Sequence, residues 1–276
     1  MTGGLAAMLA AVVVGTWNGN WFPSGRAEHR AHPDVEEATS FAAAKMLARG
    51  LAQIDPSGTN DVILCLHEMR GPRAASNLVA RIGRRGLRVV SVSGYRRRDR
   101  FDQQQDAIAT TLPVAASSWS RWRLAGKETP PRGFAFASVV TGHSVTANVY
   151  AVYLKSNYGA TTPELRALNR AKRARAAAEL VAIERKGAHV IVAGDMNADK
   201  WRKEFAEERL FSTFEKAGFA NPLAQLPADA RGTHPSSRYG DSALDYVFVR
   251  GFTARRPTIV PNDGLSDHYA LFIVLE

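Results

Sequence analysis

"HVIVAGDMNADK", residues 189–200, is the stretch that decides the fold of this chain. Its apolar run, expected as a strand over residues 190–193, stops at Asp195 and Asn197. Ligand sites in α/β proteins gather where strands end. The stretch therefore predicts an α/β fold with a site at the end of this strand, and Asp199 is interpreted as a turn or helix-capping residue.

Outward from this stretch, short β-rich runs alternate with helical patterns, as in α/β proteins. We expect strands at residues 11–17, 62–66, 87–93, 107–112, 134–140, 145–154, 190–193, 244–249 and 269–275, and helices at residues 33–49, 73–84, 163–186 and 200–217. Thr162 is predicted to cap the third of these helices, with Pro163 at its first position. Several strands follow one another without a helix between them. Two mixed β-sheets packed face to face and flanked by helices fit this order better than one doubly wound sheet.

The composition bounds the size and the partners of the protein. The chain has 276 residues, 45% of them hydrophobic, which is enough for a sizeable core, and we expect a single domain over residues 1–276 and a monomer. The formal charge of +10 favours polyanionic partners, meaning nucleic acid or an anionic membrane surface. Cys65, the one cysteine, lies in the apolar run "VILCL" and is interpreted as a buried structural thiol.

The N-terminal apolar run "LAAMLAAVVV", residues 5–14, is too short to span a bilayer. A signal peptide would carry a basic segment before this run, yet the first positive side chain is Arg26. We expect residues 1–10 to extend the first strand or to be the remnant of a trimmed leader. The protein is expected to be soluble, without stable membrane insertion, and either secreted after leader removal or cytoplasmic.

Polar residues follow other predicted strands as well. "NDVILCLHEMRG" stops at His67 and Glu68, and "GTWNGN" leaves Asn18 after the first strand. Taken one at a time, such residues are more simply explained as turn formers. Asp245 is different, because it lies within the apolar strand of "SALDYVFVRG", where a carboxylate is costly unless it is paired or bound to a metal.

The segment "GLSDHYALFIVLE" adds Asp267 and His268 ahead of the last strand. Adjacent strand residues point to opposite faces, so these two can serve one site only from a bend, which Gly264 and Ser266 favour. Carboxylate and amide oxygens suit Mg²⁺ or Mn²⁺ better than Zn²⁺. The predicted cluster of carboxylates and amides with one imidazole comprises Asn18, Glu68, Asp195, Asn197, Asp245, Asp267 and His268.

On these motifs the chain resembles the endonuclease/exonuclease/phosphatase superfamily, which includes DNase I, the exonuclease III type abasic-site endonucleases, sphingomyelinases and inositol-phosphate phosphatases. "TWNGNWFP", "LCLHEMR", "AGDMNAD", "LDYVFV" and "SDHYALFIV" stand in the order of the family over nearly the whole chain. Five loose patterns in order are together highly specific. The resemblance implies a four-layer α/β sandwich and a metal ion, Mg²⁺ or Mn²⁺, bound by Glu68, with Asn18 and Asp267 nearby.

The resemblance also implies roles for the other residues of the cluster. Asp195 and Asn197 would orient the attacking water and hold the phosphate. His268, oriented by Asp245, would act on the phosphoryl group. Whether Asp195 or His268 removes the proton of the water stays open, because that depends on hydrogen-bond geometry.

One position departs from DNase I and the sphingomyelinases. Where they carry a histidine, "AVYLKSN" has Tyr153, as the abasic-site endonucleases do. A phenol with a pKa of about 10 donates a hydrogen bond to phosphate but is a poor base near neutrality, so Tyr153 is predicted as a catalytic donor. Gln105 stands about where DNase I has a glutamate that supports the missing histidine. The tryptophan that abasic-site enzymes often place before "LDY" is absent from "GDSALDY", so abasic-site specificity is kept as an alternative.

Arginine is concentrated in "RIGRRGLRVVSVSGYRRRDR", residues 81–100. We predict that "YRRRDR" contacts substrate, its tyrosine by stacking or hydrogen bonding and its arginines by meeting the DNA backbone. Arg132, in "PPRGFAF", stands where DNase-like enzymes place a phosphate-contacting arginine. The predicted contacts to phosphate or DNA are Tyr95, Arg96, Arg97, Arg98, Arg132 and Asn157.

Three functions from different classes fit the sequence. The preferred one is a Mg²⁺-dependent DNase I-like endonuclease that hydrolyses the DNA backbone with little sequence preference. The second is a phosphodiesterase or phosphatase that acts on lipid headgroups or small phosphate esters, for which Trp119 and Trp122 are candidate docking residues, although a plain surface loop is the simpler interpretation of them. The third, a catalytically silent binding module, is disfavoured because every metal-side residue of the pattern is present.

Overall fold

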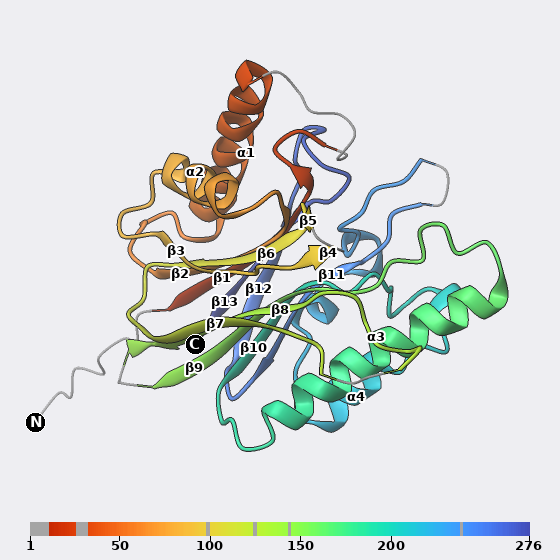
Figure 1. Ribbon diagram of the computed structural model, residues 1–276. Coiled ribbons are helices and arrows are strands. Elements are labelled where there is room, and N and C mark those ends of the chain that lie inside the picture. The colour runs from red at the N-terminus through yellow and green to blue at the C-terminus, as the bar shows by residue number, and fades with distance from the viewer. Residues whose placement is uncertain (1–10, 26–32, 98–99, 124–125, 143–144, 238–239) are drawn as a thin grey trace, which may run out of the picture.

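The strands form two stacked sheets with helices on both outer faces (Figure 1). The computed structural model describes residues 11–25, 33–97, 100–123, 126–142, 145–237 and 240–276. α1 and α2 cover the first sheet, and α3 and α4 cover the second (Figure 1). This is the four-layer α/β sandwich of two mixed sheets that the sequence predicts.

The first sheet holds both ends of the described chain. Its order is β12-β13-β1-β2-β6-β3, and β1 lies between β13, which runs antiparallel to it, and β2, which runs parallel. A two-stranded hairpin, β4-β5, follows β3. The bounds are β1 Val12–Phe22, β2 Asp61–Met69, β3 Arg88–Val92, β4 Arg96–Arg97, β5 Arg100–Phe101, β6 Gln105–Thr110, β12 Ala254–Val260 and β13 Ala270–Leu275.

The strands of the second sheet follow one another along the chain. In the sequence they lie between β6 and β12 of the first sheet. Its order is β11-β10-β9-β8-β7. β10 is parallel to β9 and antiparallel to β11. The bounds are β7 Val114–Arg121, β8 Gly133–Val140, β9 Thr146–Tyr153, β10 Val190–Asp195 and β11 Asp245–Arg250.

Within the described residues the α-helices are α1 Pro33–Ile54, α2 Pro72–Ile82, α3 Pro163–Ile183 and α4 Leu210–Lys216. Short 3-10 turns lie at Lys203–Phe205, Pro222–Gln225 and Ala228–Ala230. α3 begins as predicted, because the side chain of Thr162 accepts a hydrogen bond from the backbone N–H of Leu165 at 3.3 Å.

Two apolar clusters hold the layers together. Neighbouring residues of a strand point to opposite faces, so Val13 packs with Leu47 of α1 while Val14 packs with Val149 and Val192 of the second sheet. The larger cluster fills the space between the two sheets and extends under α3 and α4. Because both faces of β1 and β2 are buried, their sequences are continuous apolar runs rather than alternating ones.

The expected strands are all present, but four others were missed and one helix was wrong. β7 escaped because both of its faces are largely exposed and its sequence does not alternate. β12 contains Arg256 and Pro257, which an edge strand tolerates. The helix expected over 200–217 is a 3-10 turn followed by the short α4, because Glu208 turns inward to pair with the buried Arg173 of α3. Tertiary ion pairing overrides helical propensity there.

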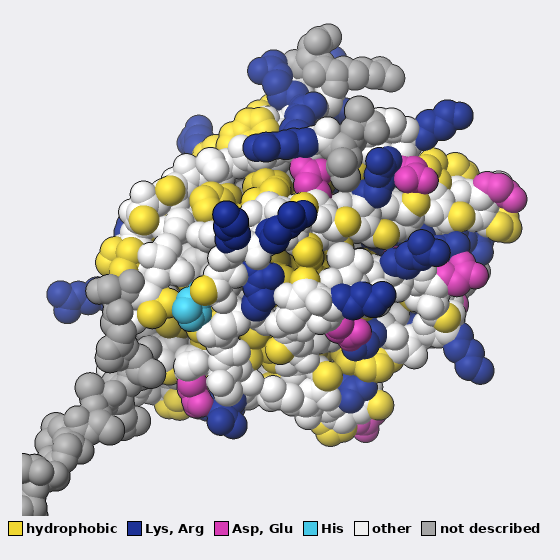
Figure 2. Space-filling view, turned by 90° about the horizontal axis from the view of Figure 1, so that it is seen from below, with side chains coloured by type: hydrophobic (Ala, Val, Ile, Leu, Met, Phe, Trp, Pro, Cys, Tyr) yellow, Lys and Arg dark blue, Asp and Glu magenta, His cyan; other side chains and the backbone are white. Residues whose placement is uncertain are grey.

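Basic side chains are dispersed over at least one face of the molecule. Figure 2 shows Lys and Arg side chains spread over the face seen from below, with Asp and Glu among them. The described helices include none with the length and apolarity that a membrane crossing requires. Residues 1–10 lie outside the described part of the chain.

Candidate active site

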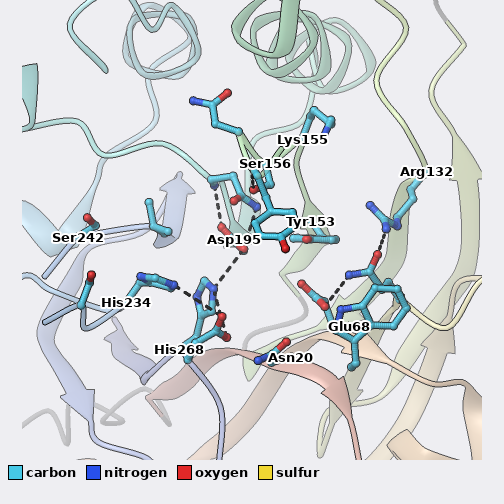
Figure 3. A pocket seen from close by; sticks show the side chains of 18 of the residues that line it. Asn20, Glu68, Arg132, Tyr153, Lys155, Ser156, Asp195, His234, Ser242 and His268 are labelled. Carbon is cyan, nitrogen blue, oxygen red and sulfur yellow. Dashed lines mark hydrogen bonds and ion pairs between the residues drawn. The ribbon is translucent and has the colours of Figure 1, made fainter. Parts of the chain in front are cut away.

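The residues of the predicted cluster come from both sheets and meet at one edge of the sandwich. β1, β2 and β10 end there, and β11 and β13, which run antiparallel to their neighbours, begin there. They surround a cleft of about 840 Å³ (Figure 3). The cleft is lined by Asn20, Trp21, Glu68, Arg97, Gln104, Arg132, Tyr153, Lys155, Ser156, Asn157, Tyr158, Asp195, Asn197, Phe205, His234, Ser236, Ser242, Leu244, Asp267 and His268.

Asp195 is the buried centre of the site. Its Oδ1 accepts the backbone N–H of Asn197 at 2.7 Å, and its Oδ2 accepts the side-chain amides of Asn197 at 2.9 Å and Asn18 at 3.0 Å. The same Asn18 amide donates to Glu68 Oε1 at 3.2 Å. Asn18 therefore joins the carboxylate of the second sheet to that of the first, which fixes both across the seam between the sheets.

His268 is held by Asp245 at the start of β11. Its Nδ1 lies 2.7 Å from Asp245 Oδ2, which also accepts the hydroxyl of Thr233 at 2.7 Å. Its Nε2 lies 3.7 Å from Asp195 Oδ2. Burial alone lowers the pKa of His268, but the carboxylates of Asp245, Asp195 and Asp267 outweigh that effect and raise it to about 10. The imidazole is thus held protonated at neutral pH, with Nε2 directed at Asp195.

The other titratable groups are also shifted. Burial raises the pKa of Asp195 to about 7; the charge of His268 opposes this rise, while Asp245 and Glu68 add to it. Burial and the charges of Glu68 and Asp195 raise the pKa of Tyr153 well above its ordinary value. Tyr153 therefore keeps its proton and can act as a donor but not as a base.

Backbone strain is concentrated around the cleft. Of the seven non-glycine residues with positive φ in the described part of the chain, five line it: Asn20, Trp21, Glu68, Arg132 and Asn197. Such conformations cost on the order of 1–3 kcal/mol each and persist only where the surroundings enforce them. At Glu68, with φ of 56°, the register of β2 shifts against β1 and β6, so that its carboxylate enters the cleft.

The side chains present fit a hard divalent cation. Glu68 is buried, and both of its carboxylate oxygens accept amide hydrogen bonds, from Asn18 and from Gln104 at 2.6 Å, yet it forms no ion pair with any described residue. A buried carboxylate without a cationic partner is costly, and Mg²⁺ or Mn²⁺ would supply that partner. Carboxylate and amide oxygens are the ligands that these ions prefer.

Asp267 lies next to His268 in the sequence, and its side chain is half exposed. Its ion pairs are with His234 at 3.7 Å and with His268 at 3.9 Å. Burial raises its pKa, but the hydrogen bond from His234 and the charge of His268 hold it below its ordinary value.

Tyr95 and Gln105 are predicted site residues that do not line the cleft. Tyr95 is fully buried, and its hydroxyl donates to Asp106 Oδ2 at 3.1 Å, so it presents no face on which a base could stack. Gln105 does not support Tyr153; its side chain instead binds Ser93 and the backbone of Tyr95. Both predictions of contact to the site are corrected, because the two side chains are buried in the interior and do not line the cleft.

The predicted phosphate contacts divide into three groups. Arg132 lines the cleft, with its guanidinium 4.8 Å from the ring centroid of Tyr153 and its Nε 3.3 Å from Asp102. Arg97 and Asn157 also line it. Arg96 is exposed in β4, and Arg98 lies outside the described residues.

Gln104, Lys155 and His234 are among the cleft residues that the sequence reasoning missed. Gln104 donates to Glu68, and it also accepts a hydrogen bond from Arg132. Lys155 lines the wall, and burial with neighbouring cations lowers its pKa. His234 packs edge to face on His268, with ring centroids 4.8 Å apart. A histidine in "RGTHPSS", just upstream of the Asp-bearing strand, was the available signal.

Solved structures with the same fold cover nearly the whole chain. D. rerio TDP2 complexed with single-strand DNA product is 14% identical with a TM-score of 0.63, covering 97% of this chain and 99% of that chain. A variant of the 3' phosphatase NExo from Neisseria, bound to product DNA hairpin, is 14% identical with a TM-score of 0.61 over 96% and 99%. Sphingomyelinase C from Streptomyces griseocarneus is 18% identical with a TM-score of 0.57 over 96% and 99%. At these identities the likeness establishes the fold.

No curated protein sequence matches the chain. The sequence model described as "Endonuclease/Exonuclease/phosphatase family" matches residues 15–268, from β1 to the histidine that faces Asp195. The match spans the strand-end residues gathered around the cleft. The chain therefore belongs to the endonuclease/exonuclease/phosphatase family.

Proposed function

We propose that the protein is a divalent-metal-dependent phosphodiesterase, and specifically a DNase I-like endonuclease that hydrolyses the DNA backbone with little sequence preference. The observation that carries the proposal is Asp195, a buried carboxylate of raised pKa that is fixed by two amide side chains and lies 3.7 Å from His268. Members of its family are phosphoester hydrolases. Shifted groups that converge in a cleft are typical of catalytic sites.

In this proposal Asp195 orients the attacking water and removes its proton. Its pKa of about 7 matches that task near neutral pH. His268, held protonated by Asp245, donates from Nε2 to the phosphoryl oxygens as negative charge develops on them. Tyr153 and Arg132 add donors on the opposite wall.

The cation belongs to the Glu68 side of the cleft, with Asn18 beside it. When bound, Mg²⁺ or Mn²⁺ would neutralise charge on the phosphoryl group. Glu68 is kept in place by Gln104, which also binds Arg132, so the carboxylate and the phosphate-binding arginine share one support.

Nucleic acid is the preferred substrate because of the basic wall and rim. Arg97, Arg132 and Lys155 line the cleft, and the formal charge of the chain is +10. Cationic side chains near phosphates bind backbones without sequence preference. Two structures with this fold, those of TDP2 and NExo, contain DNA products.

A lipid or small phosphate ester is the second candidate substrate class. Tyr158, a highly exposed aromatic at the rim of the cleft, suits insertion among headgroups as well as stacking on a base. A sphingomyelinase shares the fold. Trp122, considered for docking from the sequence, is buried against Phe134 and contributes nothing to this surface.

The test is nicking of supercoiled plasmid at low salt with Mg²⁺, Mn²⁺ or EDTA. Parallel reactions use an oligonucleotide with a 3' phosphate and sphingomyelin vesicles. Asp195→Asn and Glu68→Gln should each lower the rate at least about 1,000-fold while circular dichroism stays unchanged. Asp229→Asn, at an exposed carboxylate away from the cleft, is the matched control and should behave as the parent protein.

Metal-dependent nicking that both variants lose would support the nuclease. Cleavage of sphingomyelin alone would transfer the proposal to the lipid class. Equal rates for the parent and Asp195→Asn would refute the assignment of the site.

A further inference from the structure

A second group of metal-ligating atoms lies beside the catalytic carboxylates. His234, Asp267 and His268 bring two imidazoles and a carboxylate together, with all three ligand atoms within 4.8 Å of one another. Figure 3 shows His234 beside His268 on the side of the cleft away from Glu68. The group is therefore separate from the oxygen ligands around Glu68.

The spacing of these atoms is close to that of a tetrahedral ion. Zn²⁺ bonds of about 2.0–2.2 Å place neighbouring ligands roughly 3.3–3.6 Å apart. Asp267 Oδ2 lies 3.7 Å from His234 Nε2, and its other oxygen, Oδ1, lies 3.9 Å from His268 Nε2, so the carboxylate bridges the two imidazoles. The side chain of His234 is partly exposed, so a small rotation of its ring would close the set.

His268 is already oriented as a metal-bound histidine would be. Histidines that ligate metals almost always donate the second ring N–H to a carboxylate or carbonyl, which fixes the tautomer and directs the other nitrogen. Asp245 Oδ2 accepts the hydrogen bond from Nδ1 of His268 at 2.7 Å, which leaves Nε2 directed toward Asp267.

We propose that His234, Asp267 and His268 form a second cation site, specific for borderline-soft transition metals of the Zn²⁺ class, with its fourth position open to the cleft. Imidazole ligands select Zn²⁺ and its neighbours, whereas Mg²⁺ prefers oxygen. The two sites divide the cations by chemistry: the hard ion beside Glu68 and the softer ion beside His234.

Occupation of this site inhibits hydrolysis. A Zn²⁺ ion binds Nε2 by displacing its proton to solvent, so His268 loses the N–H that it would direct at the phosphoryl group, and the ion occupies the cleft. This consequence rests on the proposed function, whereas the binding itself does not.

The binding test uses Co²⁺ as a spectroscopic substitute for Zn²⁺. The full chain, freed of metal with EDTA and dialysed into saturating Mg²⁺, is titrated with Co²⁺ while visible absorption is recorded. We expect intense bands of four-coordinate Co²⁺ at one equivalent, and their loss when Zn²⁺ is added. Titration without such bands, in protein folded by circular dichroism, would overturn the site.

Variants assign the bands to these residues. His234→Ala and, separately, Asp267→Asn should each weaken Co²⁺ binding at least about tenfold. His189→Ala is the matched control, because His189 packs against Phe252 and does not line the cleft. Bands of parental affinity in His234→Ala would overturn the site, and two independent variants guard against local misfolding of either one.

The regulatory consequence is tested by titrating Zn²⁺ into the Mg²⁺-supported reaction. The Zn²⁺ concentration for half inhibition should match the Zn²⁺ affinity from Co²⁺ displacement. His234→Ala should raise this concentration at least about tenfold, with the inhibition of each protein expressed as a fraction of its rate without Zn²⁺. Unchanged sensitivity in this variant would overturn the inhibitory role. Should the protein hydrolyse no phosphodiester, the proposed function fails, while the Co²⁺ experiment still decides the site.

Discussion

In the proposed mechanism Asp245 orients His268, so its role can be tested separately from that of Asp195. Its carboxylate fixes the imidazole at 2.7 Å and is the largest source of the raised pKa of His268. The hydroxyl of Thr233 donates a hydrogen bond to the same oxygen of Asp245. The side-chain amide of an asparagine in place of Asp245 would therefore keep the packing. Position and charge at His268 can therefore be tested by one isosteric change.

Asp245→Asn is expected to lower kcat by about 100- to 10,000-fold, as when the carboxylate partner of a catalytic histidine is replaced. Because Asp245 raises the pKa of His268 to about 10, its removal lowers that pKa. The alkaline limb of the profile of kcat against pH should therefore move to lower pH. A folded variant with a rate within threefold of the parent would contradict the role, and Asp229→Asn controls for loss of one carboxylate.

Most of the cluster around Asp195 was predictable because its residues follow apolar runs. A buried strand that stops at Asp195 or Glu68 shows in the sequence where its polar end lies. Gln104 was not predictable in the same way. Neighbouring side chains along an extended backbone point to opposite faces, so an error of one residue replaces a side chain that faces the cleft by one that faces the interior. The sequence argument selected Gln105 as a support for the residue at position 153, but Gln105 binds the backbone of Tyr95 in the interior, and its neighbour Gln104 supports Glu68.

At the scale of single elements, β10 shows how closely the two sheets approach near the site. Gly194, directly before Asp195, has φ of 151°, and a Cβ there would lie 1.9 Å from the backbone oxygen of Val152 and 2.8 Å from Cε1 of His67. The first contact is with the neighbouring strand, the second with the opposite sheet. No side chain fits at this position without moving backbone.

Gly194→Ala should lower the free energy of unfolding by at least about 3 kcal/mol or prevent folding, because overpacking and backbone strain add. Denaturation in urea measures the effect. Gly142→Ala is the control, because a Cβ there meets nothing within 4 Å and should change stability little. A stable Gly194→Ala variant would show that β9 and β10 can separate without cost.

The turn between α1 and β2 depends on another buried carboxylate. Asp55 accepts hydrogen bonds from Ser57 at 2.8 Å and from the backbone N–H of Asn60 at 3.1 Å, and it pairs with Arg84 at 2.6 Å. Burial raises its pKa, but these partners outweigh burial and hold it below the ordinary value of 3.8. Its ionised form therefore stabilises the fold at any pH above that value.

Asp55→Asn should cost about 1.5–3 kcal/mol of unfolding free energy at pH 7. The folded pKa is depressed, so this stabilisation is present above pH 3.8 and is lost as the pH falls through the folded pKa. The gap between parent and variant should therefore close in acid. Urea denaturation at several pH values measures it, and a constant gap down to the acid limit would rule out ionisation as its source.

Element boundaries were predictable where local signals and tertiary packing agree. Thr162 and Pro163 start α3 as their types favour. The expected helix over 200–217 failed because Glu208 pairs with Arg173 of α3, a long-range contact that no local pattern reports. β7 failed for a related reason, since an exposed edge strand needs no apolar alternation.

For the whole molecule, the formal charge of +10 influences which partners the protein associates with and does not determine its fold. The cationic side chains are dispersed over the surface in Figure 2 and also line the cleft. Affinity for DNA should therefore depend steeply on salt, and each arginine that meets a phosphate should contribute about one unit to the slope of log affinity against log salt.

Arg97→Ala should lower that slope by about one unit and weaken binding of all DNA sequences alike, because Arg97 lines the cleft. Lys186→Ala is the matched control. Lys186 lies between α3 and the start of β10, at the end of that strand remote from Asp195. Fluorescence anisotropy with the inactive Asp195→Asn protein measures both, and equal slopes for the two variants would contradict a contact by Arg97.

The layer order of the whole molecule followed from strands without intervening helices, as in residues 134–154. No local pattern shows that the strands of the second sheet lie, in the sequence, between strands of the first sheet. β12 and β13 come after the second sheet along the chain and return to pair beside β1. Such pairing over the length of the chain follows from burial of the long apolar strand β13, not from turn chemistry.

That return brings the two ends of the described chain together: Val12 lies opposite Leu275 in neighbouring antiparallel strands. The cleft lies at the other ends of these strands, where β1 reaches Asn18 and His268 precedes β13. A short linker would thus suffice to join Leu275 to Val12, with new termini opened in a surface loop of the second sheet. For the same reason, the region from Val12 to Leu275 could be grafted into a loop of a host protein with the edge that carries the cleft facing outward.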